Sequence, residues 1–284
     1  MQNVNIGGVP EHFNLAWYLT LRDGAYRKEN IQLQWHDYHG GTGDMCQALR
    51  NKEIDIAVIL TEGIIKDIID GNPSKIVQTF VQTPLNWGIH VAKNSPYKTI
   101  KDLKGTKAAI SRYGSGSHLM AYINAENHNW NLNTDLQFEV IEDLEGAVKG
   151  LTQGIADYFL WEKFTTKPLV DNGIFRRIGN CPSPWPCFVI AVRNDFIEHN
   201  NHALSVILNI INKTTQEFKT IPSIDKTIAN RYKQKLDDVQ EWLHLTKWSQ
   251  SLIDNNTITK TQEKLLALDI IPKIVDYDLL VHKL

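Results

Sequence analysis

The sequence is poor in cysteine and has no long apolar run. Its three cysteines, Cys46, Cys181 and Cys187, form no Cys-x-x-Cys pair, so neither a disulfide framework nor a zinc knuckle is predicted. No stretch approaches the roughly 18 apolar residues of a membrane-spanning helix, which argues against membrane insertion. The first residues, MQNVNIGGVPEHF, lack the basic start and apolar segment of a signal peptide. We therefore expect a cytoplasmic protein, or an exported one whose leader has been removed.

An excess of basic charge is also missing. Thirty Lys and Arg residues stand against 32 Asp and Glu, which leaves a formal net charge of −2. Nucleic-acid binding requires a basic surface, so no nucleic-acid partner is predicted. The 284 residues, of which 42% are hydrophobic and 9% aromatic, are typical of an ordinary globular protein. This length accommodates about two domains.

Short apolar runs followed by helical periodicity recur along the chain. Three such strand–helix pairs occupy residues 4–70, and three more occupy residues 105–173, with residues 78–97 interpreted as a bridge. KEIDIAVILTE at 52–62 is similar to QGIADYFLWE at 153–162, so the two sets read as similar halves. From about Asp195 the pattern is helical, including one helix over 227–245. Alternating strands and helices predict parallel sheets, with ligands beyond the carboxyl ends of the strands.

One loop has a composition that suits either of two roles. SRYGSGSHLMA, residues 111–121, has two glycines and three serines where an apolar run gives way to a helical pattern. Such a loop is a tight turn that caps the helix, or a cradle whose backbone N–H groups face a ligand. It is not a dinucleotide fingerprint, because the G-x-G-x-x run ends on Leu119.

The segment KNSPYKTIKDLKGTKAAISRYGSGSHLMA, residues 93–121, carries a family resemblance. It resembles the start of the second lobe of type II periplasmic solute-binding proteins, in particular the nitrate, sulfonate and taurine binders and their thiamine-precursor relatives. The resemblance implies an α/β fold of two doubly wound lobes joined by hinge strands, with a helical C-terminal region packed on the first lobe. Residues 1–88 and 190–284 would form lobe 1, and residues 89–189 lobe 2. The crossings would lie near Trp87 to Val91 and Cys187 to Ala191.

The resemblance and the positions after the strands give a set of expected ligand contacts. In those relatives the G-S-x-S-H loop faces the ligand at a helix N-terminus, which implies contacts from Ser115, Gly116 and Ser117. Arg112 and Tyr113 precede this loop and suit an anion or an aromatic ring. The remaining candidates follow other strands or flank the return crossing: Gly41, Thr42, Gly43, Thr61, Glu62, Trp161, Glu162, Trp185 between Pro184 and Pro186, and His12 beside Glu11.

The expected function is binding of a small anionic or pyrimidine-like ligand, with closure of the lobes and no turnover. No metal is predicted, because His36 and His39 in WHDYH face opposite sides of a strand. No cofactor is predicted either. The enzyme alternative is the related synthase of the thiamine pyrimidine precursor. By family resemblance it needs a lysine and a histidine after the third strand, where this chain reads IDIAVILTEG. A ligand-gated sensor or interaction module is the other alternative. We expect a monomer, and a transporter or signalling partner stays open.

Overall fold

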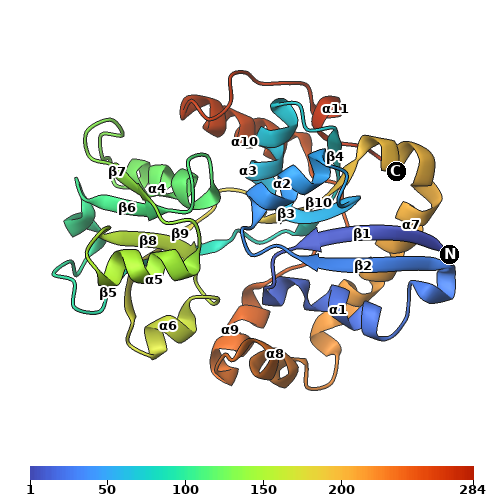
Figure 1. Cartoon of the computed structure of the whole chain (residues 1–284), viewed down its shortest axis with the longest axis horizontal. Coiled ribbons are helices and arrows are strands. Elements are labelled where there is room, and N and C mark those ends of the chain that lie inside the picture. Colours follow the sequence, from blue (N-terminus) through green and yellow to red (C-terminus); the bar gives the residue numbers. More distant parts are fainter. The chain divides into compact units, whose positions relative to one another are not determined.

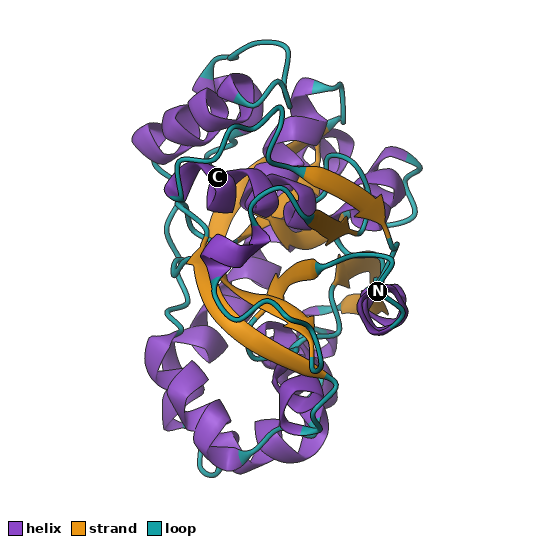
Figure 2. Cartoon of the chain, turned by 90° about the vertical axis from the view of Figure 1, so that its left-hand side faces the viewer, coloured by secondary structure: helices purple, strands orange, loops and turns teal.

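The computed structural model describes all 284 residues, which form two compact units. Unit 1 consists of Met1–Thr83 and Trp185–Leu284, and unit 2 of Pro84–Pro184. Each unit holds one five-stranded sheet flanked by helices (Figures 1 and 2). The chain leaves unit 1 just before β5 (Asn86–Ala92) and returns just before β10 (Phe188–Arg193). None of the helices combines the length and the apolar composition that crossing a bilayer requires.

Unit 1 contains the N-terminal strands and the C-terminal helices. Its sheet has the order β2-β1-β3-β10-β4, in which β10 runs antiparallel to both of its neighbours. The other strands are β1 (Gln2–Gly8), β2 (Ile31–Asp37), β3 (Ile56–Leu60) and β4 (Ser74–Val81). The helices are α1 (Leu15–Arg22), α2 (Thr42–Arg50), α3 (Thr61–Ile69), α7 (Asn194–Glu217), α8 (Ile224–Tyr232), α9 (Leu236–Leu245), α10 (Asn255–Ala267) and α11 (Tyr277–Leu280). Of the C-terminal helices, α7 packs on α1 and α10 packs on α3.

Unit 2 repeats this sheet from a contiguous segment. Its order is β7-β6-β8-β5-β9, and β5 is the antiparallel strand. The other strands are β6 (Lys107–Ile110), β7 (Gln137–Val140), β8 (Tyr158–Glu162) and β9 (Phe175–Pro182). The helices are α4 (Gly116–Asn127), α5 (Leu144–Thr152) and α6 (Lys167–Asp171). Across each sheet, three neighbouring parallel strands are followed by the antiparallel strand and then by the fifth strand at the edge.

The two halves match most closely at an aspartate before the third strand of each sheet. The N–H of Asp55 donates to the carbonyl of Asn5, and its carboxylate accepts from the Asn5 N–H, both at 2.8 Å. Asp157 makes the same two contacts with Lys107, again at 2.8 Å. The similarity that the sequence shows between residues 52–62 and 153–162 thus reflects one repeated contact.

Two details differ from the expectations drawn from the sequence. The bridge expected over residues 78–97 contains the end of β4, because its alternating apolar residues pair with β10, and all of β5, which covers the hinge strand expected at Trp87–Val91. The single helix expected over 227–245 is two helices. Lys233 takes a left-handed conformation, with φ of 56°, and ends α8 before α9 begins.

Candidate functional site

The serine loop of unit 2 joins β6 to α4 and is held by its own hydroxyl groups. The Oγ of Ser115 caps α4 by accepting a hydrogen bond from the N–H of His118 at 3.3 Å. The Oγ of Ser117 accepts from the N–H of Ser111 at 3.0 Å. Ser117 Oγ also lies 3.1 Å from the Oγ atoms of Ser111 and Ser115. The loop is therefore a cap and a turn, and Ser115 and Ser117 are both buried in it.

His118 completes this loop and was not singled out from the sequence. Its Nδ1 accepts a hydrogen bond from the N–H of Gly114 at 3.1 Å, which places the proton of the neutral ring on Nε2. The side chain is 8% exposed, and its Nε2 is buried without a hydrogen-bond partner. Burial lowers the pKa of His118 to about 4, so the ring is neutral at pH 7. The start of α4 thus holds one unused neutral donor.

Three aromatic rings pack edge-on against His118. Its ring centroid lies 4.6 Å from Phe138, 4.8 Å from Tyr122 and 5.3 Å from Tyr113, each in an edge-on arrangement. Tyr113 is 66% exposed, which leaves most of its ring open to contact. Arg112, its neighbour, is half-buried. These rings give the loop an aromatic border.

In unit 1 the expected contacts gather where α2 and α3 begin. Gly41, with φ of 68°, precedes α2, and no side chain caps that helix. A Cβ on Gly63, in the first turn of α3, would lie 2.3 Å from the Cγ2 of Thr42. Only a glycine at this position lets the two helix starts approach so closely. The structure therefore places Thr42 next to the first turn of α3, which starts at Thr61.

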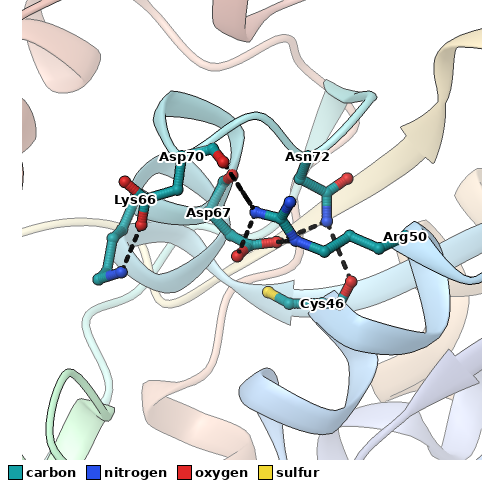
Figure 3. Close-up of polar contacts among 6 residues, drawn as sticks. All are labelled: Cys46, Arg50, Lys66, Asp67, Asp70 and Asn72. Carbon is teal, nitrogen blue, oxygen red and sulfur yellow. Dashed lines mark hydrogen bonds and ion pairs between the residues drawn. The ribbon is translucent and has the colours of Figure 1, made fainter.

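The far ends of α2 and α3 are held by a polar network (Figure 3). Arg50 of α2 forms two hydrogen bonds with the carboxylate of Asp67 in α3, at 3.1 and 2.9 Å. Asn72 donates to the same carboxylate at 2.6 Å and to the carbonyl of Cys46 at 3.1 Å. These contacts raise the pKa of Arg50, the hydrogen bond to Asp67 being the main cause. The two helices are thereby fixed to each other at both ends.

Thr61 and Glu62 hold the segment by which the chain returns to unit 1. The Oγ1 of Thr61 donates to the carbonyl of Pro186 at 2.6 Å, and its N–H donates to the carbonyl of Cys187 at 3.1 Å. The Nε1 of Trp185 donates to the Oε2 of Glu62 at 2.7 Å. Glu62 is buried, and burial raises the pKa of its carboxyl to about 7. Trp185 is buried too, and its indole contributes a hydrogen bond here instead of an open aromatic face.

Trp161 and Glu162 end β8 in unit 2. Oε2 of Glu162 accepts hydrogen bonds from the N–H groups of Phe164 and Thr165 at 2.9 and 2.6 Å. Burial raises the pKa of this carboxyl to about 7 as well. Trp161 is half-buried and stacks on Phe159 at 5.2 Å. Glu162 ends a strand, whereas Glu62 lies in the first turn of α3, so the two glutamates occupy different positions after the matching aspartates.

His12 lies in an aromatic cluster of unit 1. Its ring is 4.3 Å from Trp242, 4.8 Å from Phe13 and 5.9 Å from Tyr232. The side chain is buried, and burial lowers the pKa of His12 to about 3. The carbonyl of the preceding Glu11 accepts from the hydroxyl of Tyr232 at 3.1 Å. This environment suits a neutral histidine in a hydrophobic core.

The WHDYH motif belongs to a cluster that sequence reasoning missed. Asp37 accepts hydrogen bonds from Tyr18 and from the Nε1 of Trp35, the latter at 2.8 Å. The guanidinium of Arg231, at the end of α8, lies 4.1 Å from the centre of the Tyr18 ring. His36 is hydrogen bonded to Asn5 at 3.0 Å. Nowhere in the structure do three His, Cys, Asp or Glu side chains gather as they would around a metal ion.

Known proteins share this architecture. A family model described as Ca3427-like PBP matches residues 87–181. A search of curated proteins finds no match. The Candida albicans CA3427 gene product, described as defining a new family with the generic periplasmic binding protein fold, is similar with a TM-score of 0.88. It is 23% identical, over 98% of this chain and 93% of that one.

Sulfonate-binding proteins are also among the similar structures. The alkanesulfonate-binding protein SsuA of Xanthomonas axonopodis pv. citri, bound to MOPS, has a TM-score of 0.85 and 16% identity, over 100% of this chain and 99% of that one. The aliphatic sulphonate-binding protein SsuA of Escherichia coli has a TM-score of 0.77 and 17% identity, over 99% and 92%. Since all three identities are low, the likeness establishes the fold. The chain has the periplasmic binding protein fold.

Proposed function

We propose that this protein binds a small anionic or pyrimidine-like molecule and closes its two units over that molecule without turnover. The observation that carries the proposal is the start of α4, where a buried imidazole Nε2–H has no partner. A buried donor without a partner is costly, and a ligand acceptor would remove this cost. The N-terminus of a helix also favours a negative group.

The serine hydroxyls supply a further donor. Three hydroxyl groups, from Ser111, Ser115 and Ser117, share two Oγ–Oγ contacts. Each contact uses one hydroxyl proton, so one of the three protons is left to donate outward. The loop thus offers a neutral imidazole donor and a hydroxyl donor at one helix start, both of which suit a sulfonate, carboxylate or phosphate oxygen.

The similar structures point in the same direction. Two of them are described as sulfonate-binding, and a sulfonate presents three acceptor oxygens and one negative charge. The exposed ring of Tyr113 beside the loop offers a surface on which a planar ligand can stack. The cytoplasmic location predicted from the sequence is part of this proposal. A transporter or signalling partner belongs to the same proposal.

Thermal unfolding in the presence of small sulfonates, carboxylates and phosphorylated heterocycles tests the proposal. A ligand at about 100 times its Kd adds about 2.7 kcal/mol to the free energy of unfolding, which a melting curve detects. For a compound that binds, Ser115→Asp and Ser115→Asn form a matched pair. Both side chains cap a helix, but only Asp adds a negative charge. We expect Asp to weaken anion binding at least about tenfold relative to Asn.

Equal affinity of these two variants for an anionic ligand would contradict a site at this loop. Closure has its own measurement. Small-angle scattering at saturation should show a smaller radius of gyration than scattering without ligand. Mass spectrometry of the compound after incubation should show it unaltered, since chemical conversion would support the enzyme alternative.

A further inference from the structure

A cavity of about 450 Å³ opens on unit 1 among the C-terminal helices. It is lined by the short helix Phe218–Thr220, by the start of α8 and by the end of α9. Helix α8 packs on the short helix and on α9, and α8 and α9 lie next to each other in Figure 1. The cavity is widely open to solvent, and its volume falls within the range of small-molecule sites in proteins. None of the candidate ligand contacts described above lines it.

The floor of this cavity is aliphatic. It is made by Ile221 in the turn before α8, Ile224 in the first turn of α8 and Leu243 in α9. Ile224 and Leu243 are 5% and 9% exposed, so their positions are fixed by packing in the core of the unit. Contact with these side chains would remove an apolar ligand chain from water, which favours binding.

The lining includes one lysine that forms no ion pair within the chain. Lys219 lines the cavity, and burial together with the charge of nearby Lys247 lowers the pKa of its ammonium group. Neither lysine forms an ion pair within the chain. His244, at the end of α9, lines the same cavity. An anion beside Lys219 would offset the repulsion between the two ammonium groups.

One acidic side chain also lines the cavity. The carboxylate of Asp225 accepts hydrogen bonds from the Nε2 of Gln240 at 2.9 Å and from the N–H of Lys226 at 2.8 Å. These contacts lower the pKa of Asp225, so it stays ionised near neutral pH. Its charge repels an anion, which places an anionic head at the Lys219 side of the cavity.

We propose that this cavity is a second ligand site, which binds a small amphipathic anion. An aliphatic chain lies on Ile221, Ile224 and Leu243, and a carboxylate or sulfonate head lies at Lys219. This site differs from the start of α4 in its residues and in its ligand, since it requires an aliphatic chain. It therefore does not depend on the function proposed above.

Octanoate is the probe for this proposal, with octylammonium as the control of opposite charge. Two-dimensional amide NMR of the full chain should show octanoate shifting the signals of residues 219–225 and 240–247, and octylammonium should leave them unchanged. Affinity should rise from butyrate to hexanoate to octanoate, by up to about fourfold for each methylene buried. Lys219→Glu should weaken octanoate binding at least about tenfold. Lys260→Glu, the same charge change on the exposed face of α10, should leave binding unchanged.

Three results would overturn the proposal. One is the absence of shifts at millimolar octanoate, and another is shifts confined to the serine loop of unit 2. The third is equal weakening by the Lys219 and Lys260 variants, which would mean that octanoate responds to overall charge. A Lys219→Glu variant with an unchanged melting temperature and lost binding supports it, since Lys219 is exposed and its substitution leaves the core intact.

Discussion

The indole Nε1 of Trp185 donates a hydrogen bond of 2.7 Å to the Oε2 of Glu62. This contact joins the first residue after the return to unit 1 with the first turn of α3. The acceptor is a buried carboxyl group whose pKa is raised to about 7 by burial. The neutral acid and the ionised carboxylate both accept this bond, but only the neutral acid avoids the desolvation of a buried charge.

Glu62→Gln should therefore change the pH dependence of stability. The pKa of Glu62 is about 7 in the folded chain, against an ordinary value of 4.5 for a glutamate side chain. Because the folded state holds this proton more tightly, the stability that the Glu62 carboxyl contributes is fully present below about pH 4.5. It is lost as the pH rises to about 7. The loss amounts to about 3 kcal/mol. Gln keeps the acceptor and has no proton to lose, so the variant should gain that stability at pH 8 and little at pH 4.

Urea unfolding at the two pH values measures this difference. Glu263→Gln, on the exposed face of α10, is the matched control and should leave the pH dependence unchanged. If Glu62→Gln and the wild type lost stability equally between pH 4 and pH 8, the buried carboxyl would not be the cause.

His12→Phe should act on the acid side. Burial lowers the pKa of His12 to about 3 from the ordinary histidine value of 6.5. The unfolded chain binds this proton first, so stability falls as the pH falls below 6.5, by up to about 1.4 kcal/mol per pH unit until about pH 3. Phe keeps the aromatic contacts and removes the titration. Melting temperatures between pH 4 and 7 should show a shallower decline in the variant, whereas His202→Phe on the exposed part of α7 should show none of this change.

The close approach of α2 and α3 predicts a rescue between two substitutions. Gly63→Ala would place a Cβ 2.3 Å from the Cγ2 of Thr42. We expect it to destabilise unit 1 by about 1 to 3 kcal/mol, as overpacking does. Thr42→Ser removes that methyl group and should restore most of the loss. Chemical denaturation of both single variants and the double variant measures the coupling. If the losses of the two single variants simply added in the double variant, the contact between residues 63 and 42 would not determine how closely α2 and α3 approach.

The network of Figure 3 predicts unequal effects for two neighbouring ion pairs. Asp67 accepts from both Arg50 and Asn72, and its side chain is 20% exposed. Asp67→Ala should cost about 1 to 3 kcal/mol, because it leaves two donors without their acceptor. Lys66→Ala breaks only the helical pair with Asp70 and should cost about 0.5 kcal/mol or less. If urea unfolding showed similar losses of stability for Asp67→Ala and Lys66→Ala, the hydrogen bonds of the Asp67 network would contribute no more than an ordinary ion pair.

The fold was predictable from the sequence because its parallel strands alternate with helices. The loops after β1, β3 and β6 lie where the periodicity places them, and the resemblance carried by residues 93–121 gave the two-lobe architecture. The antiparallel strand β5 covers Trp87–Val91, where the resemblance placed a hinge strand, whereas the periodicity left these residues in a bridge because β5 pairs with strands far away in the sequence. The break at Lys233 has no glycine or proline to mark it.

The candidate site was less predictable than the fold, because burial decides what each side chain can do. The sequence singled out Trp185 as an aromatic wall, whereas the structure commits its indole to Glu62. His118 ends the G-S-x-S-H motif, yet its unpaired Nε2 becomes evident only when the contact of its Nδ1 with Gly114 is known. The cluster of Tyr18, Asp37 and Arg231 joins three elements that no sequence spacing connects.

The position of β10 between β3 and β4 fixes an order of events on the ribosome. A nascent chain that ends before Phe188 contains β3 and β4 but lacks the strand that hydrogen-bonds to both. Unit 2, by contrast, is one continuous stretch, Pro84–Pro184, and all of its sheet has been synthesised by then. During translation the middle third of the chain can therefore reach its native sheet first. Until β10 emerges, β3 is unpaired along one edge and β4 has no partner strand.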